Sequence, residues 1–152
     1  MDQTKVIAEN RKARYDFFIL SSVEAGIALA GTEVKSLRAG KASLVDSYAA
    51  VEAGEVFLHS LHISPYDPAS RFNHDPVRKR KLLLHRAEIR RLRKETDEKG
   101  LTLVPLRLYF NAEGRVKVEI AVAKGKRAHD RREVVAERDA RREISRAMKD
   151  RG

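Results

Sequence analysis

The side chains in this sequence that could do chemistry are mostly basic. The chain of 152 residues has 32 Lys and Arg against 22 Asp and Glu, and its sequence pI is about 10.1. Clustered ammonium and guanidinium groups favour binding to a polyanion, because neutralising phosphates releases condensed counterions. Charge alone leaves RNA, DNA and an anionic membrane surface open as partners.

The residues that could catalyse a reaction or hold a metal do not form a convincing set. His59 and His62 are three residues apart, which places them on opposite faces of a strand, and no third ligand lies at a natural spacing. His74 and Asp75 resemble a base with its orienting acid but have no evident nucleophile. The KGKR string at Lys124 lacks the upstream glycine and the Ser or Thr of a phosphate-binding loop. We therefore expect a protein that is not an enzyme and has no metal, cofactor or small-molecule substrate. A metal-dependent nuclease remains the enzymatic alternative.

The positive charge is concentrated at the C-terminal end. Residues 124–152 contain 11 basic and 6 acidic residues, so about a fifth of the chain carries half of its net charge of +10. Within this tail a narrow apolar stripe recurs every fourth residue, at Ala136, Ala140, Ile144 and Met148. Such a helix is marginal in water. We predict a domain at residues 1–123 and a basic tail at residues 124–152 that is disordered when free and helical when bound. The alternative is a solvated charged helix with no task.

The sequence gives no sign of export or of a membrane anchor. The N-terminal residues lack the apolar segment of a signal peptide, and no window approaches the length of a membrane span. The chain has no cysteine, which fits a reducing compartment. We expect a cytoplasmic protein without a membrane partner.

Hydrophobic patterns predict the elements that must position the basic side chains. We expect a strand over residues 15–29, with a bulge or sharp bend at Gly26, and then a short helix that is capped by Thr32 and closes at Gly40. In that helix Val34 and Leu37 face inward. Residues 45–51 and 55–63 read as a hairpin, and the proline-containing stretch 64–77 reads as a loop.

The second half of the domain has the clearest patterns. Residues 85–99 predict a helix with Ile89 and Leu92 inward, ended by Gly100. Residues 106–110 and 116–122 alternate as a strand pair with one buried and one wet face. The fold class is therefore mainly β with short helices, as an antiparallel β-barrel of oligonucleotide-binding type. A β-sandwich is the competing architecture.

Several long strings resemble one known family. NRKARYDFFI, EAGIALAGTEVKSLRAGKASLVDSYA, GEVFLHSLHISPY, FNHDPVRKRKLLLH, KGLTLVPLRLYF and KVEIAVAKGKRAHDRRE occur in the order typical of the SsrA-binding proteins, also called small protein B. The resemblance runs from Asn10 to the C-terminus. It implies a non-enzymatic protein with an oligonucleotide-binding barrel that binds the tRNA-like domain of transfer-messenger RNA in ribosome rescue, or trans-translation. The runner-up is a general ribosome-associated RNA-binding module without this specificity.

The resemblance also implies which residues contact RNA. Glu24 of the EAG string is expected to accept hydrogen bonds from bases or a 2′-hydroxyl, while Leu83 and His85 of KLLLH offer an apolar surface and a ring. Basic residues around them are expected to position phosphates. The full predicted RNA-binding set is Asn10, Lys12, Arg14, Glu24, Lys35, Arg38, Lys41, Arg78, Lys81, Leu83, His85 and Lys117.

The tail is implied to act on the ribosome. In the family it is understood to become helical in the empty messenger channel, next to the decoding centre of the small subunit. Here His129 can stack on a base, and Asp130, Arg131 and Arg132 match the family's acid-base-base motif. The predicted tail set is Lys124, Lys126, Arg127, His129, Asp130, Arg131 and Arg132.

Overall fold

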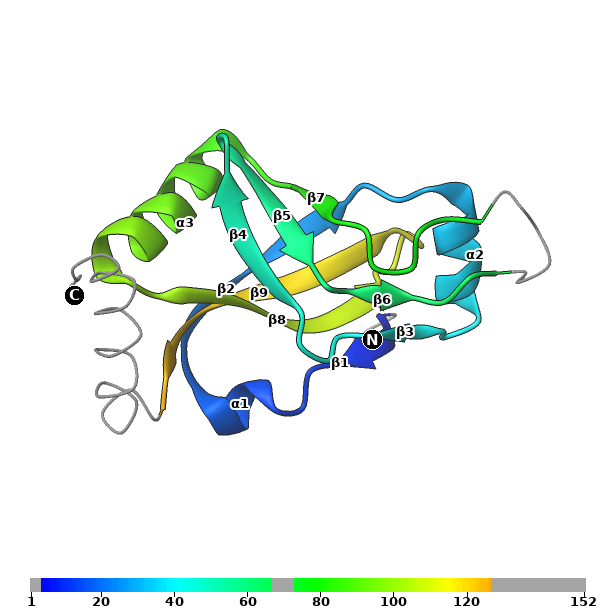
Figure 1. Cartoon of the computed structure of the whole chain (residues 1–152), viewed down its shortest axis with the longest axis horizontal. Helices are drawn as coiled ribbons and strands as arrows, with labels where there is room; N and C mark the ends of the chain where they lie inside the picture. Colours follow the sequence, from blue (N-terminus) through cyan, green and yellow to red (C-terminus); the bar gives the residue numbers. More distant parts are fainter. Residues whose placement is uncertain (1–3, 67–72, 127–152) are drawn as a thin grey trace.

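A computed structural model describes residues 4–66 and 73–126. Within them the chain forms short helices around a strongly curved antiparallel sheet (Figure 1). In chain order the elements are β1 (Lys5–Glu9), α1 (Ala13–Asp16), β2 (Phe17–Ile27), α2 (Gly31–Arg38), β3 (Ala42–Ser43), β4 (Tyr48–Glu52), β5 (Glu55–His59), β6 (His62–Ile63), β7 (Arg80–Leu83), α3 (Arg86–Lys99), β8 (Thr102–Phe110) and β9 (Val116–Gly125). None of the helices in this part of the chain is long and apolar enough to cross a membrane.

The sheet closes into a barrel. Its strand order is β1-β8-β4-β5-β7-β2-β9, and β9 pairs back onto β8. The ring is therefore complete, and β1 pairs with the C-terminal half of β8. This closure confirms the predicted mainly β barrel and excludes the β-sandwich alternative, which has two separate sheets. The short β3 and β6 pair with each other outside the ring.

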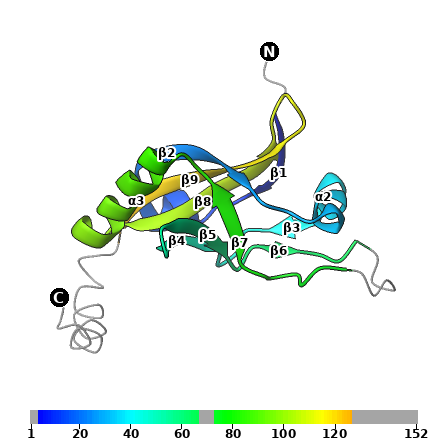
Figure 2. The same cartoon turned by 90° about the horizontal axis from the view of Figure 1, so that it is seen from above.

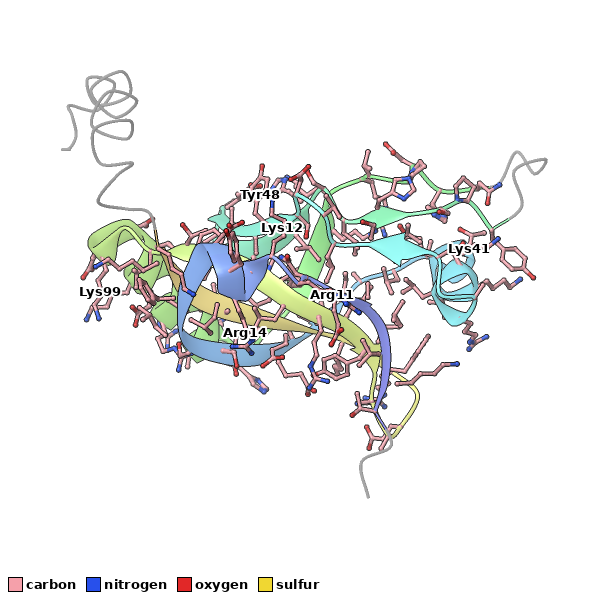
Figure 3. The ribbon with its side chains drawn as sticks, turned by 90° about the horizontal axis from the view of Figure 1, so that it is seen from below. Arg11, Lys12, Arg14, Lys41, Tyr48 and Lys99 are labelled. Carbon is pink, nitrogen blue, oxygen red and sulfur yellow. The ribbon has the colours of Figure 1, made fainter. Side chains whose placement is uncertain are left out.

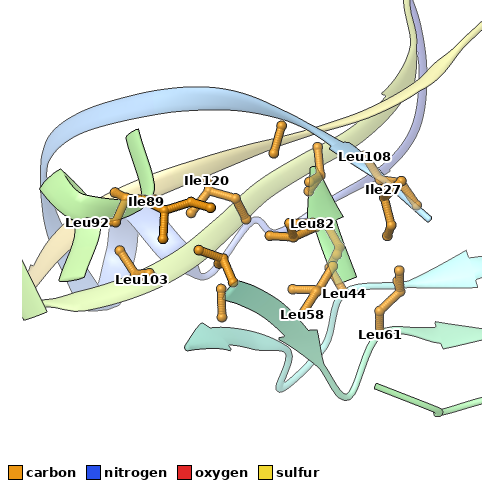
Figure 4. Close-up of a cluster of buried hydrophobic side chains, with 14 of the residues drawn as sticks. Ile27, Leu44, Leu58, Leu61, Leu82, Ile89, Leu92, Leu103, Leu108 and Ile120 are labelled. Atoms are coloured by element: carbon orange, nitrogen blue, oxygen red, sulfur yellow. The ribbon is translucent and has the colours of Figure 1, made fainter. Parts of the chain in front are cut away.

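The barrel interior is the main hydrophobic core. Strand residues such as Leu58, Leu82 and Ile120 are fully buried there, and Figure 4 shows their side chains converging between the strands. Helix α3 closes one end through Ile89 and Leu92, as the sequence predicted. Its start at Arg86 after His85 and its end at Gly100, whose φ is 66°, also confirm that prediction. Figure 2 shows α3 and α2 at opposite ends of the molecule.

The predicted hairpin is partly right. Strands β4 and β5 pair from Tyr48 with His59 to Glu52 with Glu55, and Ala53 and Gly54 form the turn with positive φ. The second strand does not continue to Ile63, because Ser60 adopts a φ of 66° and the chain turns away into β6. The stretch 64–77 contains no helix or strand where the structure describes it, in agreement with the predicted loop.

The predicted start of the first long strand and the irregularity predicted at Gly26 both need correction. The strand predicted from residue 15 begins at Phe17, because residues 13–16 form the single turn of α1. The break in strand register lies between Ile19 and Ser21 and not at Gly26. Gly26 is instead a point of close approach, since a Cβ there would lie 3.2 Å from the Cβ of Leu83.

The cap predicted for α2 is also wrong. The helix starts at Gly31, and the backbone N–H of Ala30 donates to Glu33 Oε1 at 2.8 Å. The hydroxyl of Thr32 lies 3.0 Å from Nδ1 of His74 and so binds the loop before β7 rather than its own helix. Leu37 is buried and Val34 half-buried, as predicted.

Strand β8 departs from simple alternation. A register shift between Pro105 and Arg107 turns Leu106 to the opposite side from Leu108. Leu106 joins a second small core under α1, together with Ala13, Val104, Ala121 and Ala123. The face predicted to be wet is therefore covered along the first half of the strand. The alternation predicted for β9 is right, because Val118, Ile120 and Val122 all face the main core.

Candidate RNA-binding surface

Strand pairing brings Glu24 and Leu83 together although they are far apart in the sequence. Gly26 of β2 pairs with Leu83 of β7 on one side and with Lys117 of β9 on the other. Leu83 is 52% exposed, and Glu24 lies two residues before Gly26 with its side chain in solvent. A hollow of about 360 Å³ beside them is lined by Gly26, Leu83 and Lys117, among others. The strands thus place an apolar tip and a cation at one depression, with the acceptor Glu24 two residues along β2 from its Gly26.

Tyr109 holds the Glu24 carboxylate in place. Its phenol donates to Glu24 Oε2, while its ring is only 4% exposed. Burial, followed by the hydrogen bond to Glu24, raises the pKa of Tyr109 well above its usual range, so the phenol remains a donor. The Arg107 guanidinium lies 4.4 Å from the centre of the Tyr109 ring, and its Nε donates to Glu119 at 3.0 Å. One oxygen of Glu24 is therefore occupied from within the protein, and the other can accept from a ligand.

His85 and Lys81 border the same region on the β7 side. The His85 backbone N–H donates to Glu88 Oε1 at 3.0 Å, which anchors the start of α3 and leaves the ring exposed. The Lys81 ammonium lies 3.6 Å from Glu55 Oε2 in an exposed ion pair.

The cations predicted around α2 lie at the far end of the barrel. Lys35, Arg38 and Lys41 are exposed, and the Lys35 ammonium lies 5.5 Å from the centre of the Tyr66 ring. Arg78 is committed to an ion pair, because its Nη2 donates to Glu33 Oε1 at 2.7 Å. This pair leaves about a third of the Arg78 side chain exposed.

A buried ion pair beneath Arg78 was not predicted. Glu33 and Arg80 are both 0% exposed, and Arg80 Nε donates to Glu33 Oε2 at 2.7 Å. Arg80 also donates to the carbonyls of Leu61 at 2.6 Å and Pro76 at 3.1 Å. Burial opposes ionisation of Glu33, but hydrogen bonds from Arg78, the Ala30 N–H and Arg80 hold its pKa below the ordinary value. The cluster ties α2, the loop and β7 together behind the candidate site.

The remaining predicted residues lie around α1. Figure 3 shows Lys12 and Arg14 projecting at α1, with Arg11 close by and Lys41 at the distant α2 end. Asn10 is anchored by its side-chain amide, which donates to the Pro105 carbonyl at 2.9 Å. Figure 1 places α1 and β7 on opposite sides of the barrel. The predicted RNA-binding set is therefore split among the Glu24–Leu83 surface, the α2 end and the α1 side.

Only the beginning of the predicted tail falls within the described residues. Lys124 pairs with Phe18 inside β9, which continues to Gly125, past the predicted domain boundary at residue 123. The Lys126 N–H donates to the Asp16 carbonyl at 2.8 Å. Arg127, His129, Asp130, Arg131 and Arg132 lie outside the described residues.

Sequence reasoning missed Tyr109, Arg107 and the Glu33–Arg80 pair. The sequence did carry a signal for Tyr109, because a large aromatic ring on the face of β8 predicted to be solvent-exposed indicates that another side chain or element packs over it. No local signal distinguishes the buried Arg80 from its exposed neighbours. His59, weighed as a metal ligand, is engaged otherwise, since its Nε2 lies 2.6 Å from Glu52 Oε2 and its ring stacks on Tyr48. No group of three potential metal-binding side chains occurs in residues 4–66 and 73–126.

Comparison with known proteins shows to which family this chain belongs. The chain is 60% identical over 149 residues to the SsrA-binding protein of Moorella thermoacetica, covering 98% of this chain and 96% of that one. It is 59% identical over 145 residues to the SsrA-binding protein of Symbiobacterium thermophilum, covering 95% and 92%. A chain of the solved structure described as "tmRNA-SmpB: a journey to the center of the bacterial ribosome" is 58% identical, with a TM-score of 0.65 over 78% of this chain and 82% of that one. The family model described as SmpB protein matches residues 7–150, and this chain therefore belongs to the SmpB family.

Proposed function

We propose that this protein binds the tRNA-like domain of transfer-messenger RNA and carries it to stalled bacterial ribosomes. The names of its relatives, SsrA-binding proteins, and the solved tmRNA–SmpB structure support this function. The observation that carries it is the Glu24–Leu83 surface, where a fixed carboxylate and an exposed apolar tip lie beside Lys117. The protein acts as a binding module and not as an enzyme, in the cytoplasm where ribosomes work.

The chemistry of this surface suits folded RNA. A carboxylate gains nothing from phosphate, but it accepts hydrogen bonds from base amino or imino groups and from a 2′-hydroxyl. Leu83 and the His85 ring offer flat or apolar contacts to unstacked bases. Cations at Lys81 and Lys117 attract the backbone without reading its sequence. Together these groups recognise the shape of one RNA rather than any polyanion.

We further propose that the tail acts in the decoding centre and the empty messenger channel. Its 11 basic residues suit a groove of ribosomal RNA, and its four-residue apolar stripe gives it a helical form when bound. The barrel and the tail would then divide the work, with one binding the RNA and the other reporting an empty channel.

The direct test is recovery of the protein from bacterial lysate followed by sequencing of the bound RNA. We expect transfer-messenger RNA to dominate, and an excess of bulk tRNA to displace it poorly. Displacement by tRNA as easily as by transfer-messenger RNA would reduce the protein to a general RNA binder. RNA incubated with the protein and magnesium should keep its length, whereas shortening would point to the nuclease alternative.

A further inference from the structure

A second hollow lies between α3 and the β5–β7 side of the barrel. It has a volume of about 480 Å³. Its floor is apolar, since Leu82 is fully buried and Ile89 is 8% exposed. Four of its lining residues are cations, namely Lys81, Arg86, Arg90 and Arg93. We call this hollow the α3 groove.

The cations of the α3 groove are incompletely neutralised. The side chains of Arg86 and Arg90 make no ion pair or hydrogen bond with any residue that the structure describes, and both are exposed. Arg93 has only an exposed pair with Asp97, at 3.5 Å. Glu55 is the acid among the lining residues, and it faces Lys81 at 3.6 Å. The groove therefore presents at least two free guanidinium groups to solvent.

The spacing of these two groups follows from the helix. Arg86 and Arg90 are four residues apart, so they project from the same face of α3, separated by about 6 Å along the axis. That separation is comparable to the distance between successive phosphates of an RNA strand. Guanidinium groups bind phosphate oxygens in a fixed, often bidentate geometry. A strand lying along the groove could thus meet one arginine at each of two neighbouring phosphates.

Leu83 connects the α3 groove to the Glu24–Leu83 surface. The same side chain lines the groove and the hollow of about 360 Å³ that Gly26 and Lys117 also line. An RNA that covers Leu83 is therefore in contact with both depressions at once. An acidic protein could also pair with these arginines. It would not account for the adjacent carboxylate of Glu24 and the apolar side chain of Leu83, which suit RNA bases.

We propose that the α3 groove binds the phosphate backbone of the RNA that is recognised at the Glu24–Leu83 surface, with Arg86 and Arg90 as its phosphate contacts. The groove thereby extends the interface from β7 along the helix. This inference rests on the proposed function, since it names a further part of the surface for the same RNA.

The test compares two double variants with the same change in charge. R86Q/R90Q removes the two free guanidinium groups of the groove, whereas R91Q/K94Q removes two exposed cations of the same helix that do not line it. Binding of the tRNA-like domain of transfer-messenger RNA is measured as a function of salt. We expect R86Q/R90Q to lose about tenfold in affinity and roughly two units of the log–log salt slope, and R91Q/K94Q to change little.

The outcomes separate this inference from the proposed function. If wild-type protein binds this RNA and E24A weakens binding, but R86Q/R90Q keeps both affinity and slope, the groove proposal is wrong and the proposed function stands. Equal losses in the two double variants would reveal bulk attraction by the helix and also overturn the groove. Loss of ribosome binding in R86Q/R90Q with unchanged RNA affinity would assign the groove to a ribosomal partner instead. No binding by wild-type protein would defeat the proposed function itself.

Discussion

Tyr109 is the residue that links the barrel to the proposed RNA contact. It is buried in β8, yet its phenol reaches the exposed carboxylate of Glu24 on β2. Burial and this hydrogen bond both raise the pKa of Tyr109, so the phenol stays protonated and can donate. The orientation of Glu24 is therefore a property of the core and not of the surface alone.

Replacing Tyr109 with Phe should weaken RNA binding, although Tyr109 itself is buried and is not expected to contact RNA. Loss of the orienting hydrogen bond is expected to cost about 1 kcal/mol of RNA affinity, against about 1–3 kcal/mol for Glu24→Ala. The two changes should not add in the double variant, because both act through one carboxylate. Fluorescence titration with the tRNA-like RNA measures all four affinities. Fully additive losses would mean that Tyr109 acts elsewhere, and native circular dichroism is the required control.

Glu33 and Arg80 contrast with Glu24, because both of these charged side chains are fully buried. Glu33→Gln should destabilise the fold by about 3–5 kcal/mol at neutral pH, because it leaves Arg80 buried without its counter-charge. The folded-state pKa of Glu33 lies below the ordinary 4.5, so its contribution is present above that value and is lost as the pH falls through the folded pKa. The variant and the wild type should therefore converge in acid.

Urea unfolding at several pH values measures this difference. Asp97→Asn is the matched control, since it breaks the exposed pair with Arg93 and should cost about 0–1 kcal/mol. A Glu33→Gln effect as small as that of the control would show that the buried pair is not a net constraint on the fold.

Among the elements, β2 has the most demanding position because it pairs with both β7 and β9. Its residue Gly26 lies where the two pairings meet, and a Cβ added there would lie 3.2 Å from the Cβ of Leu83, so that β7 would have to shift slightly to admit it. The strand is thus specified by its neighbours as much as by its own pattern. The same holds for β8, where the register shift before Arg107 lets side chains of one strand pack into both hydrophobic cores.

Gly26→Ala should displace β7 and with it the exposed Leu83. We expect a loss of about 1–3 kcal/mol in stability, typical of overpacking, together with weaker RNA binding. Gly125→Ala is the control, because a Cβ there meets nothing within 4 Å. Thermal unfolding and RNA titration of both variants check the prediction. Equal behaviour of the two would contradict the close approach of β2 and β7.

The whole molecule divides its charge between a closed barrel and a basic tail. Because β9 pairs through Gly125 and Lys126 is bonded to Asp16, the informative cut is after Lys126 and not at the predicted boundary of residue 123. The barrel would keep every strand after this cut. The proposed division of work then becomes testable with one truncation.

Protein ending at Lys126 should bind the isolated tRNA-like RNA within about tenfold of the full chain, or roughly 1.4 kcal/mol. It should fail to support peptide tagging on stalled ribosomes, because no segment would remain to occupy the empty messenger channel. A reconstituted tagging reaction measures the second effect, with full-length protein as reference. Tagging at the normal rate would show that the tail is a solvated extension without a role in rescue.

Features that depend on near neighbours in the chain could be predicted from the sequence alone. Helix α3, the β4–β5 turn and the alternation of β9 follow from apolar period, glycine position and charge, all of which operate within a few residues. The basic surplus likewise indicated a polyanionic partner, and the quoted family strings narrowed that partner to RNA. These signals are local, so no folding had to be known to read them.

Features that depend on contacts between residues distant in the chain could not be predicted and emerge only in the folded barrel. Tyr109 meets Glu24 across 85 positions, and Arg80 meets Glu33 across 47. Burial turned one arginine of the string Arg78–Lys81 into a core group while its neighbours stayed at the surface, and only the closed barrel sets which one. The closed barrel also places the α1 and α2 cations far from Leu83. The sequence could not predict this separation, because a basic residue does not indicate the face of the barrel on which strand pairing will leave it.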